Sequence, residues 1–199
     1  MVFGKGISHG GSAAMNEHMA IFVEALLRAT GRVKRHYFQL PVAGLEDPIY
    51  RERVYCYELY HQLRIGLPAD FPYLLNGEVD KNGQPMFREN IGRFKPDFIV
   101  HIPGRMTENL VVMEVKAVTA EAGEFREDLD HLRLFLQRAG YYAAISLIYG
   151  DGAQGLMEER ARGFETHFQE LRDKCALLLW HQHPGQQAQI LREIERRAP

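Results

Sequence analysis

Two apolar segments decide the fold: Lys95-Pro-Asp-Phe-Ile-Val-His101 and Asn109-Leu-Val-Val-Met-Glu-Val-Lys-Ala-Val118. Both are rich in β-branched and large apolar residues and are bounded by Pro, Gly and Asn, which predicts two strands. A hairpin folded about residues 105 and 106 would bring Asp97 opposite Glu114. Glu114 and Lys116 are two residues apart, so they share one face of their strand. The sequence therefore predicts that these three side chains converge on one sheet.

The three side chains are of the types that bind a metal ion and act on a phosphodiester. Two carboxylates and an ammonium on an apolar sheet are costly to bury unless a cation neutralises the acids. A hard divalent ion held by carboxylates, with a lysine beside its bound water, makes a hydrolytic site for phosphodiesters. The alternative is a surface ion-pair patch of little energetic value, but the apolar residues around each of the three disfavour full exposure.

The rest of the chain alternates helical and strand patterns. Asp47-Pro48 is typical of a helix start, and this helix would run to about Leu63 or Arg64. The pattern also predicts helices at residues 13–30, 120–139, 153–174 and 186–197, and strands at Tyr37–Leu40, Tyr141–Tyr149 and residues 176–180. This order predicts a mixed α/β fold (α+β) with a central mixed sheet and helices on both faces. The helix before Tyr141 is long enough for a right-handed crossover between parallel strands.

The bulk composition is that of an ordinary globular protein. The chain has 199 residues, 46% of them hydrophobic and 25% charged, and a formal net charge of −2. The length predicts one domain at residues 13–199, preceded by a flexible leader or expression remnant at residues 1–12. No membrane span or signal peptide is evident, and the spacing of Cys56 and Cys175 suits no zinc site, so we expect a cytoplasmic protein with reduced thiols.

Pro96-Asp97, followed by Glu114-Val115-Lys116, resembles the signature of the PD-(D/E)xK nuclease superfamily, which includes restriction endonucleases, repair nucleases and RecB-like exonucleases. The resemblance covers roughly half the chain, with a core at about residues 47–149, and implies a restriction-endonuclease-like fold. It implies that Asp97 and Glu114 bind Mg²⁺ or Mn²⁺ together with the backbone carbonyl of Val115. Lys116 would orient the attacking water or help to deprotonate it.

Two further features of the superfamily have candidates in this chain. Many members add a glutamate from the helix before the hairpin, and Glu58 is the candidate for that role. Its alternative is an ordinary salt bridge on a helix face. Some RecB-like members carry a Gln-x-x-x-Tyr element after the lysine, and Gln137 and Tyr141 have that spacing. Gly140 lies between them, and Tyr141 starts a strand in our interpretation.

The resemblance predicts a metal-dependent nuclease, either an endonuclease or an exonuclease, with DNA and not RNA as the expected substrate. By analogy, its setting would be restriction or antiphage defence, with a second copy or defence proteins as partners and no membrane association. Arg51, Tyr55 and Gln62 share a helical stripe with Glu58 that either lines a DNA groove or is simply solvated. His101 either approaches the phosphate or caps its strand. The alternative function is a nucleic-acid-binding or scaffolding subunit with a weak or inactive nuclease site.

Overall fold

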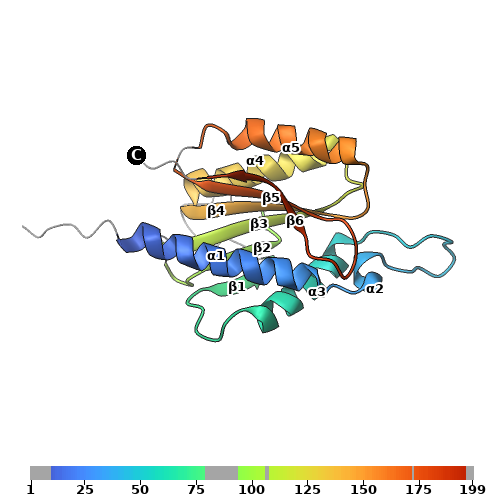
Figure 1. Cartoon of the computed structure of the whole chain (residues 1–199), viewed down its shortest axis with the longest axis horizontal. Helices are drawn as coiled ribbons and strands as arrows, with labels where there is room; N and C mark the ends of the chain where they lie inside the picture. The colour runs from blue at the N-terminus through green and yellow to red at the C-terminus, as the bar shows by residue number, and fades with distance from the viewer. Residues whose placement is uncertain (1–9, 79–93, 106–107, 172, 196–199) are drawn as a thin grey trace, which may run out of the picture.

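The computed structural model describes residues 10–78, 94–105, 108–171 and 173–195. It contains a six-stranded mixed sheet with helices on both faces (Figure 1). The helices are α1 (Gly10–Thr30), α2 (Arg35–Phe38), α3 (Glu52–Gly66), α4 (Ala122–Arg138) and α5 (Gln154–Phe168). The strands are β1 (Leu74–Gly77), β2 (Phe98–His101), β3 (Asn109–Ala117), β4 (Tyr141–Tyr149), β5 (Cys175–His181) and β6 (Gln189–Ile194). The expected mixed α/β fold with a flanked mixed sheet is confirmed.

The strands lie side by side in chain order, from β1 to β6. Antiparallel pairs join β1 to β2 and β2 to β3, whereas β3, β4 and β5 are parallel. Within the β2–β3 hairpin, Phe98 pairs with Met113 and Ile99 with Val112. The next step of this register sets Asp97 against Glu114, as expected for a hairpin centred between residues 105 and 106.

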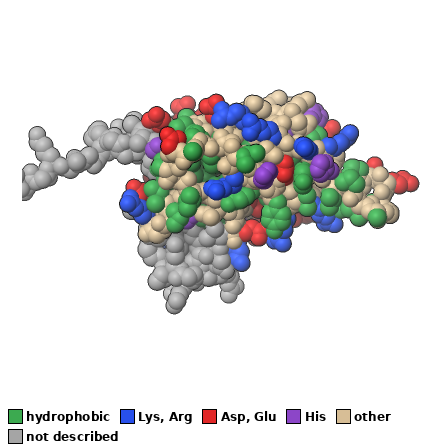
Figure 2. Space-filling view, turned by 90° about the horizontal axis from the view of Figure 1, so that it is seen from below, with side chains coloured by type: hydrophobic (Ala, Val, Ile, Leu, Met, Phe, Trp, Pro, Cys, Tyr) green, Lys and Arg blue, Asp and Glu red, His purple; other side chains and the backbone are tan. Residues whose placement is uncertain are grey.

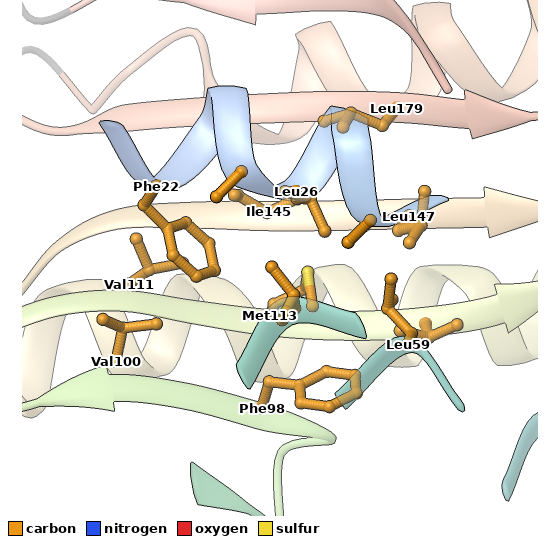
Figure 3. Packing of buried hydrophobic residues seen from close by; sticks show 14 of the residues in the cluster. Phe22, Leu26, Leu59, Phe98, Val100, Val111, Met113, Ile145, Leu147 and Leu179 are labelled. Atoms are coloured by element: carbon orange, nitrogen blue, oxygen red, sulfur yellow. The ribbon is translucent and has the colours of Figure 1, made fainter. Parts of the chain in front are cut away.

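Two apolar layers hold the helices to the sheet, α1 and α3 on one face and α4 and α5 on the other (Figure 1). Alternation along β3 divides its side chains between the layers: Met113 packs with the first layer and Val112 with the second. Figure 3 shows Leu26 of α1 and Leu59 of α3 packed among the side chains of the first face. Because Glu114 and Lys116 share parity with Val112, they project toward the face that α4 covers.

The last element differs from the expected helix at residues 186–197, because β6 is a strand that pairs antiparallel with β5. Arg and Glu favour a helix locally, yet Ile190 and Ile194 fall on strand positions that pair with Leu179 and Ala176. Without β6, the buried strand β5 would present an open edge of unpaired backbone groups. Tertiary pairing therefore overrides the local propensity.

The segment before α3 also differs from the expectation. Residues 35–38 form the single helical turn α2 in place of a strand, and this turn buries Phe38 against the rings of Tyr55 and His181. Leu40 and Ile49 form an isolated antiparallel bridge. The extended backbone at Ile49 explains why α3 begins at Glu52 and not at Pro48. At the N-terminus, α1 begins at Gly10, and residues 1–9 of the expected leader lie outside the described residues.

The surface carries charge of both signs. Seen from below the view of Figure 1, lysine and arginine side chains lie in several separate groups among acidic and apolar ones (Figure 2). This mixture agrees with the net charge of −2. No helix in the part of the chain that the structure describes is long and apolar enough to cross a membrane.

Candidate functional site

Asp97 and Glu114 lie next to each other where β2 and β3 separate. Asp97 is the half-buried residue just before β2, and Glu114 is only 8% exposed within β3. The Val115 N–H donates to Oδ2 of Asp97 at 2.7 Å, and the Asp97 N–H donates to Oε2 of Glu114 at 3.4 Å. These two hydrogen bonds, each from a backbone N–H to a carboxylate, hold the Asp97 and Glu114 side chains close to each other. The Val115 peptide unit lies beside them.

Lys116, two residues along the same face of β3, is held between two further carboxylates. Its Nζ lies 3.4 Å from Oε1 of Glu52, in the first turn of α3, and 3.3 Å from Oδ2 of Asp128, on α4. The other oxygen of Glu52 accepts the N–H of Ala117 at 3.2 Å. The side chain of Lys116 is 20% exposed and that of Asp128 is 13% exposed. The ammonium is therefore fixed between one helix from each face of the sheet.

The helix glutamate that reaches the site is Glu52, and not the expected Glu58. The two are six residues apart, which turns their side chains roughly 120° away from each other around the helix axis. Glu58 accepts a hydrogen bond from Gln62 Nε2 at 2.8 Å instead. Cys56, one turn after Glu52, faces the acids: burial and the charges of Asp97, Glu52 and Glu114 raise the pKa of its thiol.

Asp128 was missed from the sequence, although a signal was present. It stands at the i position of an apolar stripe whose i+4, i+7 and i+8 members are Leu132, Phe135 and Leu136, all buried. A carboxylate within the apolar stripe of a helix costs free energy unless it has a partner. An acid at such a position is therefore a candidate for a functional contact, here with Lys116.

The acids of the site are held in an environment that opposes their ionisation. Burial raises the pKa of Asp97 from 3.8 to about 6, although the hydrogen bond from Val115 acts in the opposite direction. Burial also raises the pKa of Glu114, and the charges of Asp97 and Asp128 add to this. Burial likewise raises the pKa of Asp128 from 3.8 to about 7, against the opposing charge of Lys116. If all three acids were ionised, their negative charge would exceed the positive charge nearby.

The pKa of Lys116 moves in the direction that keeps it charged. Burial lowers this pKa, but the charges of Asp128 and Glu52 and their hydrogen bonds outweigh burial and raise it above its usual value. Lys116 is therefore an ammonium at any pH near neutrality. Lys116 forms ion pairs with Glu52 and Asp128. It therefore neutralises the charges of Asp97 and Glu114 less directly.

The donor set near Asp97 and Glu114 suits one hard cation. Among the described residues, no group of three or more His, Cys, Asp or Glu side chains is arranged to hold a metal ion. Two carboxylates beside the Val115 peptide nevertheless offer oxygen donors, and Mg²⁺ commonly takes only one or two carboxylates and keeps several waters. The residues therefore fit a partly hydrated Mg²⁺ ion and not a site built entirely of side chains.

The expected groove residues on α3 do not gather at the site. Tyr55 is fully buried, its OH lies 2.7 Å from Nδ1 of His181, and its ring stacks on Tyr149, so it cannot line a surface groove. Arg51 is the exposed residue preceding α3. Gln62 bonds Glu58. The stripe seen in the sequence is thus divided between core and solvent.

Three other expected site residues lie at the far end of the sheet. His101 is four residues from Asp97, about 13 Å along β2, and its Nε2 lies 3.0 Å from Oδ1 of Asn76. Tyr141 is buried at the start of β4 and pairs with Asn109, five residues and about 16 Å before Glu114. Gln137 is exposed in the last turn of α4, about 14 Å along the helix from Asp128. The Gln-x-x-x-Tyr element therefore does not reach the acids.

Comparison of this chain with models of known protein families, with curated proteins and with solved structures finds no match.

Proposed function

We propose that this protein is a divalent-metal-dependent nuclease that hydrolyses phosphodiester bonds in nucleic acid, with DNA as the preferred substrate. The observation that carries the proposal is that the half-buried Asp97 and the buried Glu114 are joined by hydrogen bonds between backbone and side chain, with Lys116 on the same face of β3 as Glu114. The choice of DNA, and a setting in restriction or antiphage defence, rest on the resemblance to PD-(D/E)xK nucleases alone.

Asp97 and Glu114 would hold Mg²⁺ or Mn²⁺, with the carbonyl of Val115 as a backbone ligand. When bound, the ion lowers the pKa of a coordinated water and stabilises the negative charge that develops on the phosphate. The raised pKa values of the two acids support this role, because a cation between them would remove their mutual repulsion and favour the ionised forms. Burial of Glu114 also supports it, since the site excludes competing water from one side.

Lys116 would act as a fixed positive charge. An ammonium with a raised pKa does not serve as a general base near neutral pH, so its contribution is to bind a phosphate oxygen and orient the attacking water. Glu52 and Asp128 would position it, because each lies within 3.4 Å of Nζ. Of the two roles expected for Lys116, orientation of water is therefore the better supported.

The test is cleavage of plasmid, single-stranded DNA and RNA by the purified protein with Mg²⁺, with Mn²⁺ and with chelator. We expect metal-dependent cleavage that Glu114→Gln and Lys116→Met each reduce by roughly 10²- to 10³-fold. Glu158→Gln, an exposed acid on α5, is the matched control and should leave the rate unchanged. Metal-independent cleavage, or equal rates for all variants, would contradict the proposal. Tight nucleic-acid binding without cleavage of any substrate would favour the alternative of a binding or scaffolding subunit.

A further inference from the structure

A cavity of about 390 Å³ adjoins the candidate site between α3 and β1. Its lining includes Tyr57, Tyr60, Asn76, Glu78, Asp97 and Phe98. We propose that this cavity binds an unpaired nucleobase of the strand whose phosphate lies at Asp97 and Glu114. The inference rests on the proposed function, because the phosphate at the site is what delivers the neighbouring base. It assigns the enzyme a substrate class: strands with at least one unstacked nucleotide at the cut.

The aromatic side chains of the cavity are placed for stacking. Tyr57 is 64% exposed, although its ring is a large apolar surface at the edge of a cavity. Tyr60 is more enclosed: its OH donates to the Leu75 carbonyl at 3.3 Å, and its ring is within 10° of parallel to that of Phe98. Bases stack on exposed aromatic rings regardless of sequence, since every base has a π face. Of the two tyrosines, Tyr57 is the one whose ring is accessible for stacking.

The charges around the cavity favour a base over a phosphate. One of its lining residues, Glu78, is an acid outside the proposed metal ligands, and its carboxylate repels an anion and can accept a hydrogen bond from an N–H group of a base. Among the described residues, Arg53 pairs with Glu78: its Nε donates to Oε1 at 3.0 Å, and its side chain is 69% exposed. The guanidinium thus stands at the rim, where the sugar-phosphate backbone would pass.

The wall of the cavity is tied directly to the candidate site. The Glu78 N–H donates to the Asp97 carbonyl at 3.3 Å, so β1 reaches the residue that would bind the metal. Glu78 has a φ of 46°, in the left-handed region that non-glycine residues seldom occupy. Such strain persists where surrounding contacts hold it, and it concentrates at functional sites. Glu78 follows directly after the end of β1, and with this backbone conformation it lines the cavity.

The cavity restricts the substrate because a base that occupies it cannot at the same time be paired and stacked in a duplex. In an intact duplex each base is paired and stacked inside the helix, and it reaches a protein pocket only after unstacking. Single strands, frayed ends and flaps present such bases without this cost. The cavity volume exceeds what one base requires and lies within the range of small-ligand pockets. The enzyme should therefore cut unpaired strands faster than fully paired blunt duplex.

The test measures base binding separately from cleavage. A single-stranded oligonucleotide carrying the fluorescent base aminopurine is titrated with the protein in Ca²⁺, and quenching reports stacking. We expect Tyr57→Ala to weaken binding by roughly ten- to hundredfold, whereas Tyr57→Phe keeps the ring and binds like the wild type. Ile65→Ser, which removes another exposed apolar side chain from α3 (60% exposed), is the matched control and should have no effect. Circular dichroism of each variant checks that α3 is intact.

Each outcome separates the cavity from the nuclease. Metal-dependent cleavage with equal affinity for the Tyr57→Ala and Tyr57→Phe variants would overturn the cavity proposal and leave the nuclease standing. Tyr57-dependent quenching without cleavage of any substrate would support the cavity and refute the nuclease. Adenosine monophosphate serves as competitor: weak competition supports a strand as the occupant, and tighter binding than the oligonucleotide would assign the cavity to a free nucleotide and overturn the proposal. Faster cutting of blunt duplex than of single strands would also overturn it.

Discussion

Replacing a candidate metal ligand should make the metal-free protein more stable. The Asp97→Asn substitution removes a charge that the fold disfavours and keeps a side-chain oxygen that can accept the Val115 N–H. Burial raises the pKa of Asp97 from 3.8 to about 6. A difference of about two pKa units corresponds to about 3 kcal/mol, the most that the variant should gain at pH 8 without metal.

The pH dependence follows from the direction of this shift. Because the folded state binds the proton more tightly than the unfolded state, the stability of the wild type falls as pH rises from about 4 through about 6, and levels off above. The advantage of Asp97→Asn should therefore shrink from about 3 kcal/mol at pH 8 to about 0.5 kcal/mol at pH 4. Mg²⁺ should reverse the order at pH 8, because it stabilises only the state with intact ligands.

Urea unfolding followed by circular dichroism, in chelator and in Mg²⁺, measures each of these quantities. At pH 8 in chelator the midpoint of Asp97→Asn should lie roughly 1 to 2 M above that of the wild type. Glu158→Gln, which removes the charge of an exposed acid on α5, should not move the midpoint. A lower midpoint for Asp97→Asn than for the wild type under these conditions would refute the electrostatic account of the site. The reasoning would also fail if Mg²⁺ stabilised both proteins equally.

Five other substitutions test the remaining contacts. Glu52→Gln should slow cleavage by roughly 10- to 100-fold, while Glu58→Gln should not, because Glu52 contacts Lys116 and Glu58 bonds Gln62 instead; initial rates on one substrate compare them. Asp128→Asn should cause a similar loss that grows at alkaline pH, since the pKa of Lys116 falls when this partner is removed; a pH–rate profile shows it, and a loss that is the same at every pH would count against the ion pair. Gly150→Ala should lower stability by about 1–3 kcal/mol in thermal unfolding, because Gly150 has a φ of +123° and a Cβ there would lie 2.5 Å from Cγ1 of Val118. Leu59→Ala should cost about 2–5 kcal/mol in urea unfolding, since Leu59 is fully buried in the layer of Figure 3; a smaller loss would mean that α3 collapses around the gap.

The sequence predicts only some of the contacts in the site, and the reason is physical. The period of two in a strand determines which side chains share a face, so the pairing of Phe98 with Met113 and the approach of Asp97 to Glu114 could be expected from the chain alone. The rotation of α3 about its own axis could not, because it is set by packing against distant parts of the chain. The rotation depends on which face of α3 packs on the sheet, and with Tyr55, Leu59 and Leu63 buried, Glu52 is the glutamate that reaches β3.

The sequence by itself determined the mixed sheet, the hairpin register and the pairing of two acids, because these depend on local periodicity and on neighbours along the chain. Only the tertiary structure decided which helices supply the partners of Lys116, since Glu52 is 64 residues away from it and Asp128 lies on the opposite face. It also decided that residues 189–194 pair as a strand, because only the assembled sheet offers the edge of β5. Contacts between distant elements depend on packing, which no local pattern of residues encodes.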